Sequence, residues 1–69
     1  MRILMNGETR ELEEGATVAD LIEQSGAGVE PRRGIAVAVD AEVVPRSAWE
    51  DTELSEGQTV ELLTAIQGG

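Results

Sequence analysis

The sequence predicts a small α+β domain in which a mixed sheet of four to five strands packs on one short helix. Two observations carry this prediction. Short apolar runs bounded by turn residues occur on both sides of a single amphipathic segment, in the order β-β-α-β-β-β. That segment covers about two helical turns, which is too short for an isolated helix, so the helix must lie on the sheet.

Residues 1–12 predict a β-hairpin. Residues 2–5 form a short apolar strand, and residues 8–12 return as a second strand. Between them, Asn6-Gly7 is a strong signal for a two-residue turn because both residues tolerate positive φ.

The predicted helix begins at Thr17. The Thr17 hydroxyl can cap the free amides, and Asp20 stands three residues later, close to a capping box. The apolar stripe at helical spacing consists of Val18, Leu21 and Ile22. We expect the helix to be ended by Gly26, Gly28 and Pro31.

The second half of the chain predicts three further strands. Residues 35–39 alternate large and small apolar side chains, Asp40-Ala41 provides a turn, and residues 42–44 form the next strand. Residues 46–54 are expected to be irregular or to include a turn of 3₁₀ helix, and residues 59–66 form the last strand.

The first and last strands are best placed side by side and parallel at the centre, because the flanking hairpins then occupy the edges without crossings. This arrangement is a β-grasp. Alternation along the strands assigns the helix-facing side to Ile3, Met5, Ile35, Val37, Val39, Val60 and Leu62. The opposite side gives a candidate partner-docking face, composed of Leu4, Ala36, Ala38, Leu63, Ala65 and Ile66. The alternative is that these are scattered apolar surface residues, which are normal.

Missing residue types exclude several kinds of chemistry. The 69 residues include no Cys, no His and, among five basic residues, no Lys. The chain therefore lacks a thiol nucleophile, an imidazole base and a lysine for a Schiff base. The acidic clusters at residues 13–14 and 50–53 lack the spaced loop of a calcium site. We predict no metal site and no enzyme activity of the chain's own.

The charge and the hydropathy pattern limit the partners. A net charge of −9 disfavours nucleic acid and favours a basic surface on another protein. No apolar run is long enough for a transmembrane helix, and the first residues lack the core of a signal peptide. We expect a cytoplasmic protein with no membrane partner.

The last residues of the sequence are Gln67-Gly68-Gly69. Glycine has no side chain to pack and loses much backbone entropy on ordering, so we expect a flexible tail, residues 67–69, on a domain of residues 1–66. Such a tail suits delivery of the Gly69 carboxylate into a narrow channel of another protein. The alternative is an ordinary frayed terminus.

Several segments also carry a family resemblance. They are residues 5–8, 15–18, 37–47 with Trp49, 56–61 and the terminal glycines. Together they span nearly the whole chain and resemble the ubiquitin-like sulfur carriers, in particular those of thiamine biosynthesis. The segment 43–49, Val-Val-Pro-Arg-Ser-x-Trp, is the most specific and points away from the small subunit of molybdopterin synthase. One departure is Asp40-Ala41, where the family usually has Asn-Gly, so the sequence leaves the type of this turn open.

The resemblance implies a function. A partner adenylating enzyme would activate the Gly69 carboxylate with ATP and magnesium, and this chain itself would bind no cofactor. Sulfur from a persulfide, generated by a cysteine desulfurase, would replace the adenylate and leave a Gly69 thiocarboxylate. A thiazole synthase would accept that sulfur to build the thiazole of thiamine.

Other functions stay open at this point. The carrier could serve another pathway, such as molybdopterin synthesis, or the chain could be a ubiquitin-like modifier that is conjugated to lysines of target proteins. A third hypothesis is a non-covalent β-grasp adaptor whose tail takes no part in the function. An enzyme is the least favoured class, because a core this small cannot enclose a pocket.

Overall fold

The computed structural model of this chain describes residues 1–25 and 34–64. Their elements follow the predicted order: β1 (Arg2–Met5), β2 (Glu8–Glu11), α1 (Val18–Ser25), β3 (Ile35–Val39), β4 (Glu42–Val44), the 3₁₀ helix η1 (Arg46–Asp51) and β5 (Thr59–Thr64). The predicted helix breakers Gly26, Gly28 and Pro31, and the predicted boundary between domain and tail after residue 66, lie outside the described residues.

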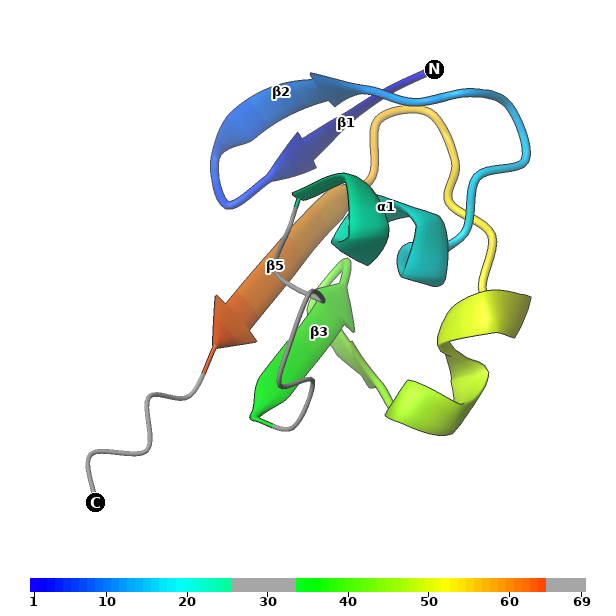
Figure 1. Ribbon diagram of the computed structural model, residues 1–69. Helices are drawn as coiled ribbons and strands as arrows, with labels where there is room; N and C mark the ends of the chain where they lie inside the picture. Colours follow the sequence, from blue (N-terminus) through cyan, green and yellow to red (C-terminus); the bar gives the residue numbers. More distant parts are fainter. Residues whose placement is uncertain (26–33, 65–69) are drawn as a thin grey trace.

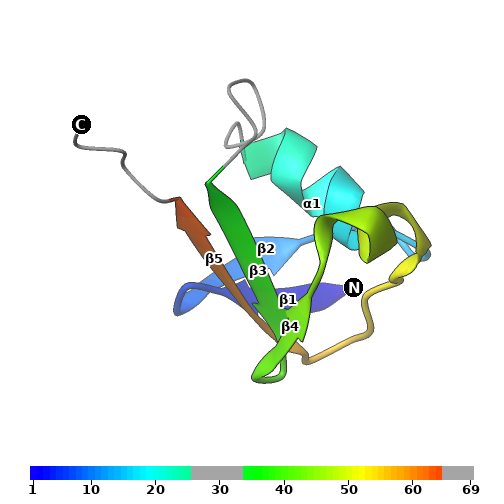
Figure 2. The ribbon, with the colours of Figure 1, turned by 90° about the horizontal axis from the view of Figure 1, so that it is seen from below.

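The five strands form one mixed sheet in the order β2-β1-β5-β3-β4. β1 and β5 run parallel at the centre, and the other neighbouring pairs are antiparallel. α1 lies across one face of the sheet, and η1 packs beside it (Figures 1 and 2). The predicted β-grasp with parallel central strands is confirmed.

Both hairpins turn through two residues with positive φ, the pattern of a type I′ turn. Asn6 and Gly7 have φ of 52° and 83°, and Asp40 and Ala41 have φ of 50° and 71°. Ala41 therefore adopts the left-handed conformation that the family's usual glycine would adopt more easily. This conformation costs an alanine about 1–2 kcal/mol.

α1 begins with the predicted capping box. The Asp20 N–H donates to Thr17 Oγ1 at 3.2 Å, and the Thr17 N–H donates to Asp20 Oδ2 at 3.0 Å. Two backbone amides at the start of the helix are thus satisfied by side chains. The helix is only eight residues long, and no helix in the described ranges is long and apolar enough to cross a membrane.

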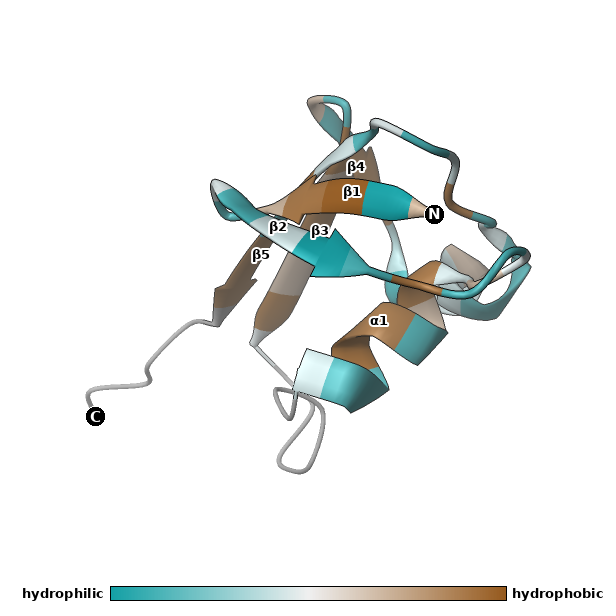
Figure 3. Cartoon of the chain, turned by 90° about the horizontal axis from the view of Figure 1, so that it is seen from above, coloured by the Kyte–Doolittle hydropathy of each residue, from teal (hydrophilic) through white to brown (hydrophobic). Residues whose placement is uncertain are grey.

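The core lies between α1 and the sheet. Six of the seven side chains predicted to face the helix are buried, and Ile35 is partly buried against them. The helix contributes Val18, Leu21 and Ile22, as predicted. Burial of each such side chain stabilises the fold by about 1.5–3 kcal/mol. Figure 3 shows hydrophobic residues concentrated in β1, β3, β5 and α1, while the edge strand β2 is hydrophilic.

Trp49 of η1 closes one side of this core. Its side chain is buried, and its indole N–H donates to the Val44 carbonyl at the end of β4 over 3.0 Å. The Arg46 guanidinium lies 5.8 Å from the centre of the indole ring, within the range of a cation–π interaction. The family-like segment around residue 46 therefore links the edge strand to the core.

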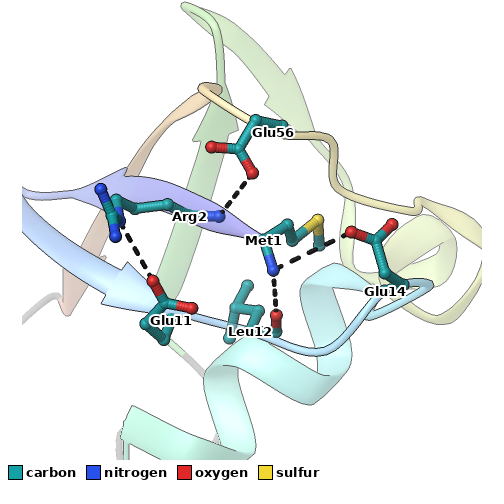
Figure 4. A network of polar contacts seen from close by, with 6 residues as sticks. All are labelled: Met1, Arg2, Glu11, Leu12, Glu14 and Glu56. Atoms are coloured by element: carbon teal, nitrogen blue, oxygen red, sulfur yellow. Dashed lines mark hydrogen bonds and ion pairs between the residues drawn. The ribbon is translucent and has the colours of Figure 1, made fainter.

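The start of the chain is tied to the loop after β2 and to the loop before β5 (Figure 4). The Met1 amino group donates to the Leu12 carbonyl over 2.6 Å and lies 3.9 Å from the Glu14 carboxylate. The Arg2 N–H donates to Glu56 Oε1 at 2.9 Å. These contacts hold the start of β1 between the two loops.

Candidate functional site

The tail predicted to carry the chemistry, Gln67, Gly68 and Gly69, lies outside the described residues, and so do Ala65 and Ile66 of the predicted docking face. The described element closest to it in sequence is β5, which ends at Thr64. β5 lies between β1 and β3 in the sheet. The contacts that hold β5 therefore determine where the chain reaches residue 64.

The side chain of Asn6 holds the second half of β5. β1 ends at Met5, so Leu62 has no backbone partner on that side. Asn6 Nδ2 donates to the Leu62 carbonyl at 3.0 Å, and the Leu62 N–H donates to Asn6 Oδ1 at 2.9 Å. One side-chain amide thus satisfies a backbone donor and acceptor, and it extends the pairing of β1 with β5 by one step.

Asp40, in the turn of the other hairpin, holds the first half of β5. The Asp40 N–H donates to the Thr59 carbonyl at 2.7 Å, and the Thr59 N–H donates to Asp40 Oδ1 at 3.0 Å. Asp40 Oδ2 also accepts a hydrogen bond from Gln58 Nε2 at 3.1 Å. Both hairpin turns therefore use a polar side chain to fasten the strand that leads towards the tail.

The sheet face away from α1 carries the described part of the predicted docking face. Leu4, Ala36, Ala38 and Leu63 all lie there, and Leu4 and Leu63 are 42% and 65% exposed. The third large apolar side chain that is exposed in the described part of the chain, Val43 at 74%, lies on the same face. The three large apolar side chains that are exposed in the described residues thus lie on one face of the sheet.

Two residues of this face were missed by the sequence reasoning. Val43 pairs with Ala38, and Glu61 pairs with Ala38 on the other side. The signal for Val43 was the two-residue turn at Asp40-Ala41, which fixes the register of the hairpin. The signal for Glu61 was its spacing of two residues from Leu63 in one strand. We use the name docking face for the described residues Leu4, Ala36, Ala38, Val43, Glu61 and Leu63.

On the α1 side of the molecule, acidic side chains line hollows of the surface. An open groove of about 680 Å³ lies between α1 and η1, and acidic residues from both helices line it beside Arg46 and Trp49. Of the predicted acidic clusters, Glu50 and Asp51 line this groove, and Glu13 and Glu14 line a second hollow that shares Asp20 and Glu23 with it. Within residues 1–25 and 34–64, no group of three acidic side chains is placed to hold a metal ion.

In the described residues, α1 covers one face of a β-grasp sheet, apolar side chains are exposed on the other face, and a central strand leads towards the Gly-Gly of the sequence. This arrangement is typical of a ubiquitin-like carrier domain. The family model described as the ThiS family matches residues 3–69. The chain is 32% identical to the sulfur carrier protein ThiS of Escherichia coli K12 over 69 residues, covering 100% of both proteins. The chain therefore belongs to the ThiS family, the sulfur carrier proteins of thiamine biosynthesis.

Solved structures agree with this assignment. The crystal structure of the thiamine biosynthesis protein ThiS from Geobacter metallireducens matches with a TM-score of 0.76 and 28% identity over 100% of both chains. The NMR solution structure of a thiamine biosynthesis protein from the same species gives a TM-score of 0.74 and covers 88% of that chain.

One relative is a longer protein. A thiazole synthase of Paramagnetospirillum magneticum is 32% identical to this chain over 69 residues. The match covers 100% of this chain but 20% of that protein. A protein named thiazole synthase thus includes a segment similar to the carrier domain.

Proposed function

We propose that the Gly69 carboxylate is the group that carries sulfur. In the first step, a carboxylate oxygen attacks the α-phosphorus of ATP in a partner adenylating enzyme, and pyrophosphate leaves. In the second step, a persulfide sulfur attacks the acyl adenylate and AMP leaves. Cleavage of the resulting acyl disulfide by a thiol gives the Gly69 thiocarboxylate and a new disulfide. The family match, which extends to Gly69, is the observation that carries this proposal.

The chain's own properties suit this role. A free α-carboxyl group is ionised at neutral pH, so it is available as a nucleophile once a metal ion in the partner screens the charges. The chain has no Cys or Lys side chain to attack its own activated acyl group. Three extended residues, such as 67–69, reach about 10 Å, which lets the tail enter a tunnel while the domain docks outside.

We infer that the partners supply all catalysis and all cofactors. The adenylating enzyme binds ATP and magnesium, a cysteine desulfurase supplies the persulfide, and a thiazole synthase accepts the sulfur. The last partner is supported by the carrier-like segment within the thiazole synthase relative. We place the docking face against these partners and the chain in the cytoplasm.

Intact-protein mass spectrometry tests the proposal. The chain is incubated with the adenylating enzyme, ATP, magnesium and a persulfide donor, and its mass is expected to rise by one oxygen exchanged for one sulfur. A variant that lacks Gly69 and a variant with one extra residue after Gly69 should both remain unmodified. Sulfur uptake by the Gly69 deletion would refute the proposal, and stable conjugates to lysines would favour a protein modifier instead.

A further inference from the structure

We propose that the Glu61 carboxylate makes the docking face selective for its protein partner, thiazole synthase. In this inference, the docking face binds an apolar surface that presents a positively charged side chain, preferably an arginine, opposite the Glu61 carboxylate. The inference rests on the proposed function, because it assumes that this face docks thiazole synthase, the partner supported by the carrier-like segment of the thiazole synthase relative.

Glu61 stands in the middle of the docking face. It pairs with Ala38 across β3 and β5, and the next pair on the same side of the sheet is Ala36 with Leu63. Val43 lies beyond Ala38 on the edge strand β4. A carboxylate is therefore surrounded on this side by methyl groups and branched apolar side chains.

On the β1 side of Glu61, no described cation forms an ion pair with its carboxylate. Leu4 of β1 pairs with Thr59, two residues before Glu61 on the same face. Arg2, two residues before Leu4 in β1, is engaged with Glu11, with 3.1 Å between Nε and Oε2. Glu61 takes part in no ion pair within residues 1–25 and 34–64, so its carboxylate is open to a charge from another protein.

The consequence for binding follows from desolvation. A partner that covers this face removes water from the Glu61 carboxylate, and an unpaired buried carboxylate is strongly unfavourable. A partner with a cation at that point replaces the lost water by a charge-assisted hydrogen bond. Arginine fits best because its planar guanidinium binds a carboxylate through two parallel hydrogen bonds and is weakly hydrated. Glu61 thus rejects purely apolar surfaces and accepts those with a matching charge.

A different role for Glu61 makes a distinct prediction. The alternative is that the sole role of the Glu61 charge on this apolar strand is to prevent self-association. In that case, removal of the charge would produce dimers or aggregates and would leave the affinity for the partner unchanged. The experiment below measures both properties.

The test compares carriers in binding to thiazole synthase from the same organism. The variants are Glu61→Gln, Glu61→Arg and the matched control Glu23→Gln, an exposed carboxylate on α1. Titration calorimetry gives Kd at low and high salt, and sedimentation velocity gives the oligomeric state. We expect Kd to rise about tenfold for Glu61→Gln and by about a hundredfold or more for Glu61→Arg. Glu61→Gln should also show a weaker dependence of Kd on salt, while Glu23→Gln stays within about twofold of the wild type.

Two results would overturn the inference. One is a Glu61→Gln variant that binds thiazole synthase with the wild-type Kd and salt dependence. The other is a variant whose sole change is self-association. Formation of the thiocarboxylate is measured separately on the wild-type chain. If the wild type acquires sulfur but Glu61→Gln binds normally, the role of Glu61 is wrong and the proposed function stands.

Discussion

The side-chain amide of Asn6 pairs with the backbone of Leu62 as if it were one more residue of β1. The donor and acceptor distances are 3.0 and 2.9 Å, and the two residues are 56 positions apart in the chain. The same Asn6 has a φ of 52° in the first hairpin turn. A single asparagine therefore meets two demands, since it tolerates the left-handed conformation and its amide is both donor and acceptor.

The first prediction concerns this contact. Replacement Asn6→Gly keeps the positive φ but removes both hydrogen bonds to Leu62, and it should lower the free energy of unfolding by about 1–3 kcal/mol. Replacement Asn6→Ala loses the same bonds and places a Cβ in the left-handed region, so it should cost about 1 kcal/mol more. Urea unfolding followed by far-UV circular dichroism measures both values.

Asn6→Asp provides the control for the hydrogen bonds. Its carboxylate can accept from the Leu62 N–H but cannot donate to the Leu62 carbonyl. We expect its stability to fall between those of the wild type and Asn6→Gly. Equal stabilities for the wild type and the glycine variant would show that the amide contact contributes nothing.

The second prediction concerns the turn at Asp40-Ala41. Ala41 has a φ of 71°, where an alanine is strained by about 1–2 kcal/mol. Glycine removes this strain, but it raises the entropy of the unfolded chain at a cost of about 0.4–1 kcal/mol. Ala41→Gly should therefore stabilise the domain by about 0.5–1 kcal/mol, seen as a higher midpoint in urea.

A glycine at an ordinary backbone position is the matched control. Ala48 in η1 is not among the residues with positive φ. Ala48→Gly should lower the stability by about 0.5–1 kcal/mol. A loss of stability in both variants would mean that the turn accommodates Ala41 without strain.

Features set by local residue chemistry could be predicted from the sequence. Asn6-Gly7 gave the first turn, Thr17 with Asp20 gave the helix start, and the alternation in residues 35–39 gave the buried face. Each of these depends on neighbours within four residues. The parallel centre of the sheet also followed, because few topologies connect these elements without crossings.

Features that join distant segments could not be predicted in the same way. Nothing near Asn6 or Asp40 in the sequence shows that their side chains fasten β5, because the partners are 56 and 19 residues away. Val43 is a local case: β4 has three residues, too few for a readable alternation, and its face followed only from the hairpin register that the Asp40-Ala41 turn fixes. The tail, residues 67–69, lies outside the described residues, and its role stays a prediction.

The third prediction concerns Trp49. Replacement Trp49→Phe keeps most of the apolar burial but removes the indole donor to the Val44 carbonyl, so it should cost about 1–2 kcal/mol. Replacement Trp49→Ala should cost about 3–5 kcal/mol, a large part of the stability of a domain this small. Circular dichroism is the suitable probe, because the chain contains no other aromatic residue to report by fluorescence.

The variant Arg46→Ala separates the contribution of the cation–π interaction from that of the buried indole. The Arg46 guanidinium lies over the Trp49 ring, 5.8 Å from the centre of the indole. Arg46→Ala should cost about 0.5–1 kcal/mol, much less than loss of the indole. A larger effect from Arg46→Ala than from Trp49→Phe would contradict the assignment of Trp49 as a core residue.

The last prediction uses two neighbouring leucines that face opposite sides of β5. Leu62 is 7% exposed and packs under α1, whereas Leu63 is 65% exposed on the docking face. Leu62→Ala should lower the free energy of unfolding by about 2–4 kcal/mol. Leu63→Ala should change it by less than about 0.5 kcal/mol, because the side chain loses little burial. Urea unfolding of the two variants measures this contrast.

The effects of the two substitutions on sulfur transfer should show the reverse order, with the larger effect for Leu63→Ala. Both variants are compared at a temperature where both are folded. Leu63→Ala should slow formation of the Gly69 thiocarboxylate by about tenfold, or raise the carrier concentration needed for it by the same factor. The reason is that the partner loses an apolar contact. Folded Leu62→Ala should react at close to the wild-type rate. If Leu63→Ala reacted like the wild type with both the adenylating enzyme and thiazole synthase, the face on which Leu63 lies would not be the surface that these partners bind.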